Sequence, residues 1–220
     1  MNMLRPGTPA MDAYVKIKSA ICQQKLKPGA VLTESYLCGA MDLGRSPIRA
    51  ALQQLSQDGF VDMPPNRSAR VAQFSHNQIR QLYSLRGMML SYALELTIET
   101  YTDQDIAALT DCLQRQEAAF RDYEFEAYLS AVSDFFSFMI KKAGNPYLDE
   151  MAESVLSKIG VFLCLYDNFY CVEKLKSLPL FRKIIDSIQK KKLKAVMQAH
   201  KELNNRVLDA YDYMILTNTQ

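Results

Sequence analysis

Apolar residues recur at helical spacing along most of this chain, and the pattern is densest after residue 75. Helices are expected there, because apolar positions fall three or four residues apart over long stretches. Several segments carry apolar residues on more than one side, so they are expected to pack against one another as a bundle. The six expected helices span about residues 76–100, 102–124, 125–142, 146–168, 177 or 179 to 192, and 193–213.

Local signals set the ends of these segments. Ser75 and Thr102 stand where a hydroxyl can accept a hydrogen bond from the first turn of a helix. The acidic residues after Thr102 suit the positive end of a helix dipole. Gly144 and Asn145 separate the third helix from the fourth, which Pro146 opens.

The N-terminal part has a different pattern, in which short helices are joined by a tight turn. A helix over residues 11–24 follows a loose arm at residues 1–9. Thr33 can cap the next helix, whose apolar face includes Leu37. Residues 42–44 interrupt the pattern before another helix begins.

The helix after this turn has one apolar and one polar face. Arg45, Arg49 and Gln53 are four residues apart, so they form one row on the polar face. An arginine can bind a guanine edge or a phosphate, and a glutamine can read adenine. This row therefore suits a DNA recognition helix. The opposite, inward face is formed by Ile48, Ala51, Leu52 and Leu55.

Pro47 and Gly59 mark the boundaries of this helix. Pro47 fits a first helical turn, where its missing N–H costs little, and either Ser46 or Gly44 is the capping residue. Free N–H groups at such a start can bind a phosphate, so Ser46 joins the candidate DNA contacts. Gly59 is typical of the residue that follows a helix.

A short basic hairpin follows. Strand-like pieces at residues 60–61 and 70–71 flank a tip at residues 64–67, and Arg67 and Arg70 are the candidate contacts to the DNA backbone. Two helices joined by a turn and followed by such a hairpin are the layout of a winged helix-turn-helix. That module places its second helix in the major groove of DNA.

The predicted fold is therefore mainly α. It has a winged helix-turn-helix with a small β-hairpin wing in residues 1–75 and an all-α bundle in residues 76–220. The net charge is +2, but residues 1–75 hold nine Lys and Arg against five Asp and Glu, whereas residues 76–220 hold seventeen against nineteen. The basic part is the part with the helix-turn-helix, which fits attraction to phosphates.

The composition excludes several other classes. No apolar run is long enough for a transmembrane helix, and residues 1–11 lack the apolar core of a signal peptide, so no membrane partner is expected. The five cysteines are scattered without a C-x-x-C pair, which is typical of thiols in a reducing cytoplasm. Because no catalytic or nucleotide-binding motif occurs, neither an enzyme nor a cofactor is expected.

Residues 26–61 resemble the DNA-binding domain of the GntR family of bacterial transcription regulators. That family reads, loosely, L-x-P-G-x-x-L-x-E-x-x-L and then S-R-x-P-V-R-E-A-L-x-x-L-x-x-[ED]-G-[LF]-[VI]. Gly44 and Ala50 depart from the usual Ser and Glu, but Arg45 and Arg49 resemble the DNA-contacting arginines of the family. The matching residues are Leu26, Pro28, Gly29, Leu32, Glu34, Leu37, Arg45, Pro47, Arg49, Ala51, Leu52, Leu55, Asp58, Gly59, Phe60 and Val61.

The helical part is similar to the FCD domain, the ligand-sensing domain of the FadR subfamily of GntR regulators. Three segments carry this resemblance: YSLRGMMLSYALELT, FFSFMIKKAGNPYL and LFRKIIDSIQKKKLKAVMQAH. In the first of them, Arg86 stands at the position of a typical arginine. Together the two resemblances cover nearly the whole chain.

The resemblance also points to a site in the helical part. Many FCD domains bind a divalent metal through one Asp and three His, and the corresponding positions here are Val132, Phe136, Phe181 and His200. One imidazole does not make such a site, so no metal is expected. The expected effector-binding residues are Arg86, His200, Phe136 and Phe181. A buried Arg86 would need an anionic partner, either a core carboxylate or a bound carboxylate ligand.

The resemblance implies a cytoplasmic regulator that binds a palindromic double-stranded DNA operator as a homodimer. Repression is the expected mode, although the residues do not separate it from activation. A small effector, either a carboxylate or an apolar molecule, would act on the helical part. In the alternative, that part is only a dimerisation and protein-interaction module without an effector, and the sequence leaves both open.

Overall fold

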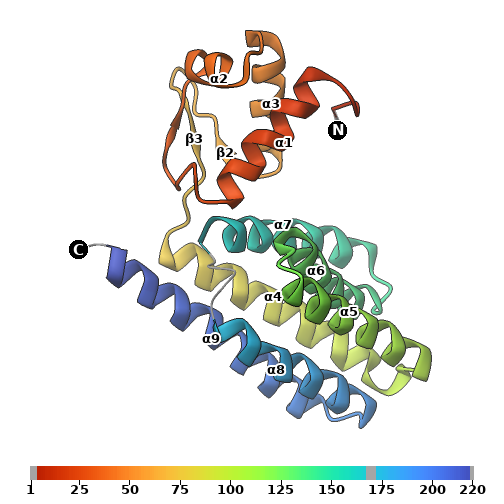
Figure 1. The fold of residues 1–220 in the computed structure, drawn as a ribbon. Coiled ribbons are helices and arrows are strands. Elements are labelled where there is room, and N and C mark those ends of the chain that lie inside the picture. The colour runs from red at the N-terminus through yellow and green to blue at the C-terminus, as the bar shows by residue number, and fades with distance from the viewer. Residues whose placement is uncertain (1–3, 167–171, 219–220) are drawn as a thin grey trace. The chain divides into compact units, whose positions relative to one another are not determined.

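The computed structural model of the protein describes residues 4–166 and 172–218. The chain divides after Ser75 into two compact units (Figure 1). Each unit buries apolar side chains of its own. The N-terminal unit combines short helices with a small sheet, and the second unit is entirely helical within the described residues. This is the mainly α fold that the sequence predicts.

Three helices form most of the N-terminal unit. The first begins two residues before its predicted start, because Thr8 accepts a hydrogen bond from the Met11 N–H and Pro9 fits the first turn. The helices are α1 Pro9–Cys22, α2 Glu34–Met41 and α3 Arg45–Gln57. Their inward faces bury Ile17, Ile21, Leu37, Ile48, Leu52 and Leu55.

The starts of α2 and α3 are capped differently. Thr33 caps α2 by accepting a hydrogen bond from the Tyr36 N–H at 3.3 Å, as predicted. At α3 the capping residue is Gly44, which has no side chain to offer, and Ser46 lies inside the first turn. The first N–H groups of α3 therefore have no side-chain acceptor from the cap.

The other end of α3 is tied to α1. The Tyr14 hydroxyl donates a hydrogen bond to Asp58 Oδ2 at 2.6 Å, and Gln54 Nε2 donates one to Asp58 Oδ1 at 3.0 Å. Asp58 thus fixes the angle between the two helices. α3 is held by apolar contacts along its inward face and by these bonds at its C-terminal end.

The predicted hairpin is part of a three-stranded antiparallel sheet with the order β1-β3-β2. Its strands are β1 Val31–Leu32, β2 Val61–Asp62 and β3 Ala69–Val71. β1 was not predicted, because two residues are too few to show an alternating pattern. Gly29 leads into it at φ +79°, a backbone angle that residues with a Cβ rarely adopt, so this position favours glycine.

The C-terminal unit is a helical bundle in which α4 packs against α6, α7 and α9, and α5 packs against α6 and α8. A short 3₁₀ turn, Ile98–Thr100, extends α4. α6 also packs against α7, so α4 and α6 each contact three other helices of this unit. The helices are α4 His76–Thr97, α5 Asp103–Arg121, α6 Phe125–Lys141, α7 Pro146–Tyr166, α8 Val172–Gln189 and α9 Leu193–Asn218.

The predicted start of the fifth helix of this unit is wrong. α8 begins at Val172, and Pro179 lies inside it rather than at its beginning. A proline inside a helix removes one N–H, and its ring crowds the carbonyl four residues earlier, at a cost of about 3 kcal/mol. The packing of α8 against α9 and α5 can offset this cost. The predicted end of the fourth helix, at residue 168, lies outside the described residues.

The described cysteines are in two states. Cys38 and Cys112 are free, whereas Cys22 and Cys164 are disulfide-bonded. The prediction of thiols from the scattered cysteines is therefore wrong for Cys22 and Cys164.

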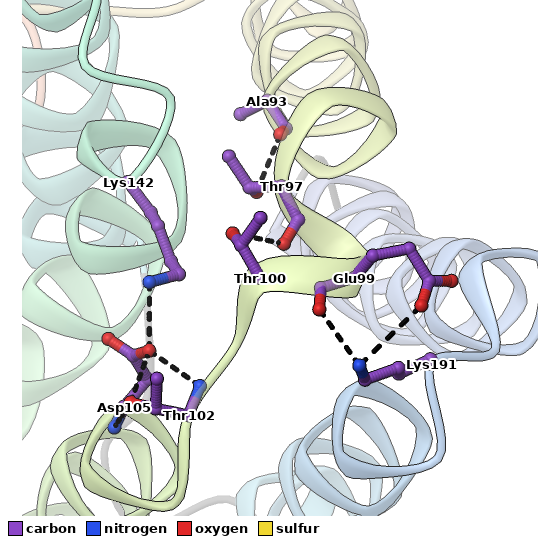
Figure 2. A network of polar contacts seen from close by, with 8 residues as sticks. All are labelled: Ala93, Thr97, Glu99, Thr100, Thr102, Asp105, Lys142 and Lys191. Carbon is purple, nitrogen blue, oxygen red and sulfur yellow. Dashed lines mark hydrogen bonds and ion pairs between the residues drawn. The ribbon is translucent and has the colours of Figure 1, made fainter.

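A polar network holds the corner where α4 ends and α5 begins (Figure 2). Thr102 and Asp105 form a capping box, in which each side chain bonds the backbone N–H of the other residue. Lys142, just after α6, donates to Asp105 Oδ2 at 2.8 Å. On the other side Lys191 donates to the Glu99 carbonyl at 2.8 Å. The corner thus joins four segments of the bundle.

Replacing Asp105 by Asn should destabilise the bundle by about 1–2 kcal/mol, because it weakens the cap and removes the charge that pairs with Lys142. The Lys142 ammonium holds the pKa of Asp105 at about 2, below its ordinary 3.8. This contribution should be complete above pH 4 and disappear as the pH falls towards 2. Urea unfolding across this pH range measures it, with Asp111→Asn, at a more exposed ion pair, as the control.

Candidate nucleic-acid interface and core site

The outward face of α3 carries the residues predicted to contact DNA. Arg45, Ser46, Arg49 and Gln53 are all exposed, whereas the opposite face of the helix is buried in the N-terminal core. The capping Gly44 leaves the first N–H groups of α3 free of side-chain acceptors. A cationic row beside a helix N-terminus can bind phosphate oxygens and base edges.

Arg49 does not project freely into solvent. Its Nε donates to Glu34 Oε1 at 2.9 Å and its Nη2 donates to Glu34 Oε2 at 3.1 Å, so the pair is bidentate. The hydrogen bond from Arg49, and secondarily the charges of Arg49 and Arg45, lower the pKa of Glu34. From the sequence, Glu34 was only a position that matches the family pattern, and its pairing with Arg49 was not predicted.

The two wing arginines are exposed as well. Arg67 lies at the tip between β2 and β3, where Asn66 adopts φ +58°. Arg70 lies on the central strand β3, opposite Val31 and Asp62 in the register. Its Nη1 donates to the Gly29 carbonyl at 3.4 Å, which holds the side chain beside the turn before β1.

The second candidate site lies in the core of the helical unit. Phe136 of α6, Phe181 of α8 and His200 of α9 come together: the Phe136 ring centroid lies 5.9 Å from that of Phe181 and 5.6 Å from that of His200. Phe135 joins them, with its ring 5.0 Å from Phe181. Val132 packs instead against the cluster of Ala119 and Tyr128. Side chains therefore fill the region where the resemblance places a site.

Arg86 of α4 lies against this aromatic cluster and is only 3% exposed. Its guanidinium carbon is 4.1 Å from the centroid of Phe136 and 4.6 Å from that of Tyr83, and its Nη2 donates to Asn204 Oδ1. Within the described residues its Nε has no hydrogen-bond partner, and no carboxylate pairs with it. Burial lowers the pKa of Arg86 to about 10, so the guanidinium stays charged at neutral pH.

His200 is the only metal-ligand type among the four positions that the resemblance identifies. Burial, and then the charge of Arg86, lower the pKa of His200 to about 3, so the imidazole is neutral. Its Nε2 has no partner among the described residues. These residues do not fit a divalent cation, because a single imidazole faces a phenyl ring and a guanidinium rather than further ligands.

A groove of about 700 Å³ runs between α4 and α9 beside this cluster. Tyr83 and Asn204, which contact the guanidinium of Arg86, line it together with His200. The surface groove and the buried cation are thus separated by only one layer of side chains. The contact of Asn204 with Arg86 was not predicted from the sequence. The burial of Gln116 was not predicted either: its side chain is fully buried, and its amide has no partner among the described residues.

The N-terminal unit is a winged helix-turn-helix, and the second unit is a helical bundle. Residues 9–71 match the gntR family of bacterial regulatory proteins, and residues 81–206 match the FCD domain. The chain belongs to the GntR family of transcription regulators, in the group that carries an FCD domain. This class is that of a transcription regulator and not of an enzyme.

Individual relatives agree with this assignment. The chain is 22% identical over 196 residues, covering 88% of this chain and 87% of the relative, to the uncharacterised HTH-type transcriptional regulator YdhC of Bacillus subtilis. Its fold is similar to that of McbR/YncC of Escherichia coli, with a TM-score of 0.66 at 20% identity over 96% of this chain and 99% of that one. Lar of Listeria monocytogenes gives 0.67 at 18% identity, over 96% and 99%. None of the helices formed by the described residues is apolar over a length that would cross a membrane.

Proposed function

We propose that the protein regulates transcription in the cytoplasm by binding a specific palindromic operator, as a repressor. The observation that carries this proposal is the exposed row of Arg45, Arg49 and Gln53 on α3, a helix whose other face is fixed in the core. Side chains on such a row can read base edges in the major groove. Ser46, Arg67 and Arg70 would supply backbone contacts, which set the register of the helix on DNA.

The operator is read by a homodimer, because one winged helix-turn-helix spans only a half-site. An apolar row on α4 supports dimerisation through the helical unit. Met88, Tyr92 and Leu96 follow at intervals of four residues and are 67%, 48% and 57% exposed. Large apolar side chains in a row are typical of a surface that a second copy of the chain covers.

The effector of this regulator is an organic anion that binds next to Arg86. The support is electrostatic: a buried guanidinium without a paired carboxylate is costly, and an anionic ligand would offset that cost. Phe136, Phe181 and His200 would contact the apolar body of the ligand. The filled aromatic cluster favours a second candidate, in which the helical unit is only a dimerisation or protein-interaction module.

Selection of binding sites from random duplex DNA tests the proposed function. A symmetric site should be enriched, and log K for that site should fall steeply and linearly with log salt concentration. Enrichment of an asymmetric half-site would contradict the homodimer but retain DNA reading. No enrichment, with only weak binding to any duplex, would overturn the proposed function.

A further inference from the structure

The side chain of Glu34 lies where a DNA-reading surface would be expected to be basic. It is at the first position of α2, near Arg45 and in contact with Arg49, and it is 32% exposed. A carboxylate so close to the candidate DNA contacts repels phosphates. Glu34 matches a position of the family pattern, but this match does not explain how its carboxylate affects Arg45 and Arg49.

The geometry of the pair suggests an answer. A guanidinium has five N–H donors, and Glu34 accepts from the Nε of Arg49 and from one N–H of its Nη2. The remaining donors are the N–H groups of Nη1 and the second N–H of Nη2, and they lie at the far end of the fork-shaped guanidinium. That end is the part of an arginine that binds the O6 and N7 atoms of guanine in a bidentate manner.

The pair also holds the guanidinium in one plane. A free arginine on a helix surface samples many rotamers and binds any nearby phosphate as a diffuse cation. When a carboxylate from another helix binds two of its donors, the free end of the guanidinium points in one direction. The carboxylate also partly neutralises the positive charge of the arginine. Both effects act against non-specific phosphate binding and in favour of one base contact.

We propose that Glu34 is a specificity-determining positioning residue, which orients Arg49 towards a guanine edge and suppresses its binding to phosphates. This inference rests on the proposed DNA-binding function. It assigns to the carboxylate a role in the ratio of specific to non-specific affinity. It does not assign to Glu34 a contact of its own with DNA.

The test uses the full-length protein, the duplex recovered by site selection and a scrambled duplex of the same length. Glu34→Gln should lower the ratio of specific to non-specific affinity by roughly tenfold, the order of discrimination that one bidentate pair supplies. Non-specific binding should become tighter, and the slope of log K against log salt should steepen by roughly 0.9, because Arg49 gains a phosphate contact.

Two further variants separate geometry from charge. Asp12→Asn removes the same charge from the exposed pair of Asp12 and Lys16 on α1, and it should change neither the ratio nor the slope. Glu34→Asp keeps the charge but is one methylene too short to hold both donors in place, so it should lower the ratio and leave the slope unchanged. Thermal unfolding should be similar in all three variants.

The outcomes are distinct. The inference would be overturned if Glu34→Gln had the same ratio of specific to non-specific affinity, and the same slope of log K against log salt, as Asp12→Asn. It would also be overturned if Glu34→Asp kept the wild-type affinity ratio. Failure of the wild-type protein to prefer any duplex would instead mean that the proposed function fails. In that case the scrambled and selected duplexes would bind equally before any substitution is made.

Discussion

Replacing Arg49 by Ala should weaken binding to the selected operator by about 1–3 kcal/mol, or roughly fivefold to 150-fold. Arg49 lies at the middle of the exposed row on α3, so its fork is placed to reach a base edge when the helix enters the groove. The loss should be confined to one position of each half-site. Titration of operators in which each base pair is changed in turn would locate that position.

Two comparisons make the Arg49→Ala result specific. Lys16→Ala removes an equal charge from the exposed ion pair on α1 and should have a much smaller effect on affinity. Arg67→Ala, at the wing, should weaken binding to all sequences alike, because a phosphate contact carries no sequence information. If Arg49→Ala weakens selected and scrambled duplexes by the same factor, Arg49 binds the backbone and does not read a base.

Much of the N-terminal unit could be predicted because its signals are local. Thr33, Pro47 and Gly59 mark helix boundaries through hydrogen bonds and backbone angles that depend on few neighbours. The strand β1 could not be predicted in this way. Its two residues are extended because they pair with β3, almost forty positions further along the chain, and no local pattern reports that pairing.

The same division applies to the candidate sites. The family resemblance was enough to bring Phe136, Phe181 and His200 together in the prediction, and the structure places these three side chains in contact. The partners of the two arginines were not predictable. Arg49 pairs with a residue 15 positions away and Arg86 with one 118 positions away. Such pairs depend on how helices are rotated against one another.

The start of α8 shows the opposite error, in which a local signal was given too much weight. Pro179 suggested a helix start, since proline is common in a first turn. In the bundle the helix continues through Pro179, and Phe181 and Ile184, just after it, are buried in the core. Tertiary packing here outweighs the local preference.

Replacing Arg86 by Met should leave the helical unit as stable as before or stabilise it by about 1–4 kcal/mol, as is often seen when buried charges are replaced by apolar residues of similar volume. Met has a similar length and can pack its sulfur against the rings of Phe136 and Tyr83. The substitution removes a cation that no carboxylate of the described residues neutralises. Urea unfolding of the full-length protein measures the change.

The hydrogen bond to Asn204 must be separated from this effect. Arg86→Met leaves the Asn204 carbonyl oxygen without its donor, which costs about 1–3 kcal/mol if that atom stays buried. The double variant Arg86→Met with Asn204→Leu removes both groups and should therefore be the more stable of the two. As a control, Arg115→Met on the surface, where Arg115 pairs with Asp111 and Asp134, should change stability little.

The same variant decides between an effector site and a structural arginine. Ligand screening by thermal shift should reveal an organic anion that stabilises the wild-type protein, by about 2.7 kcal/mol at a concentration of 100 times its Kd, and has no effect on Arg86→Met. If Arg86→Met is more stable than the wild type but is no longer stabilised by the anion, Arg86 serves ligand binding and not stability. If both variants instead lose several kcal/mol and no anion stabilises the wild type, Arg86 belongs to the core, and the helical unit is a dimerisation or interaction module.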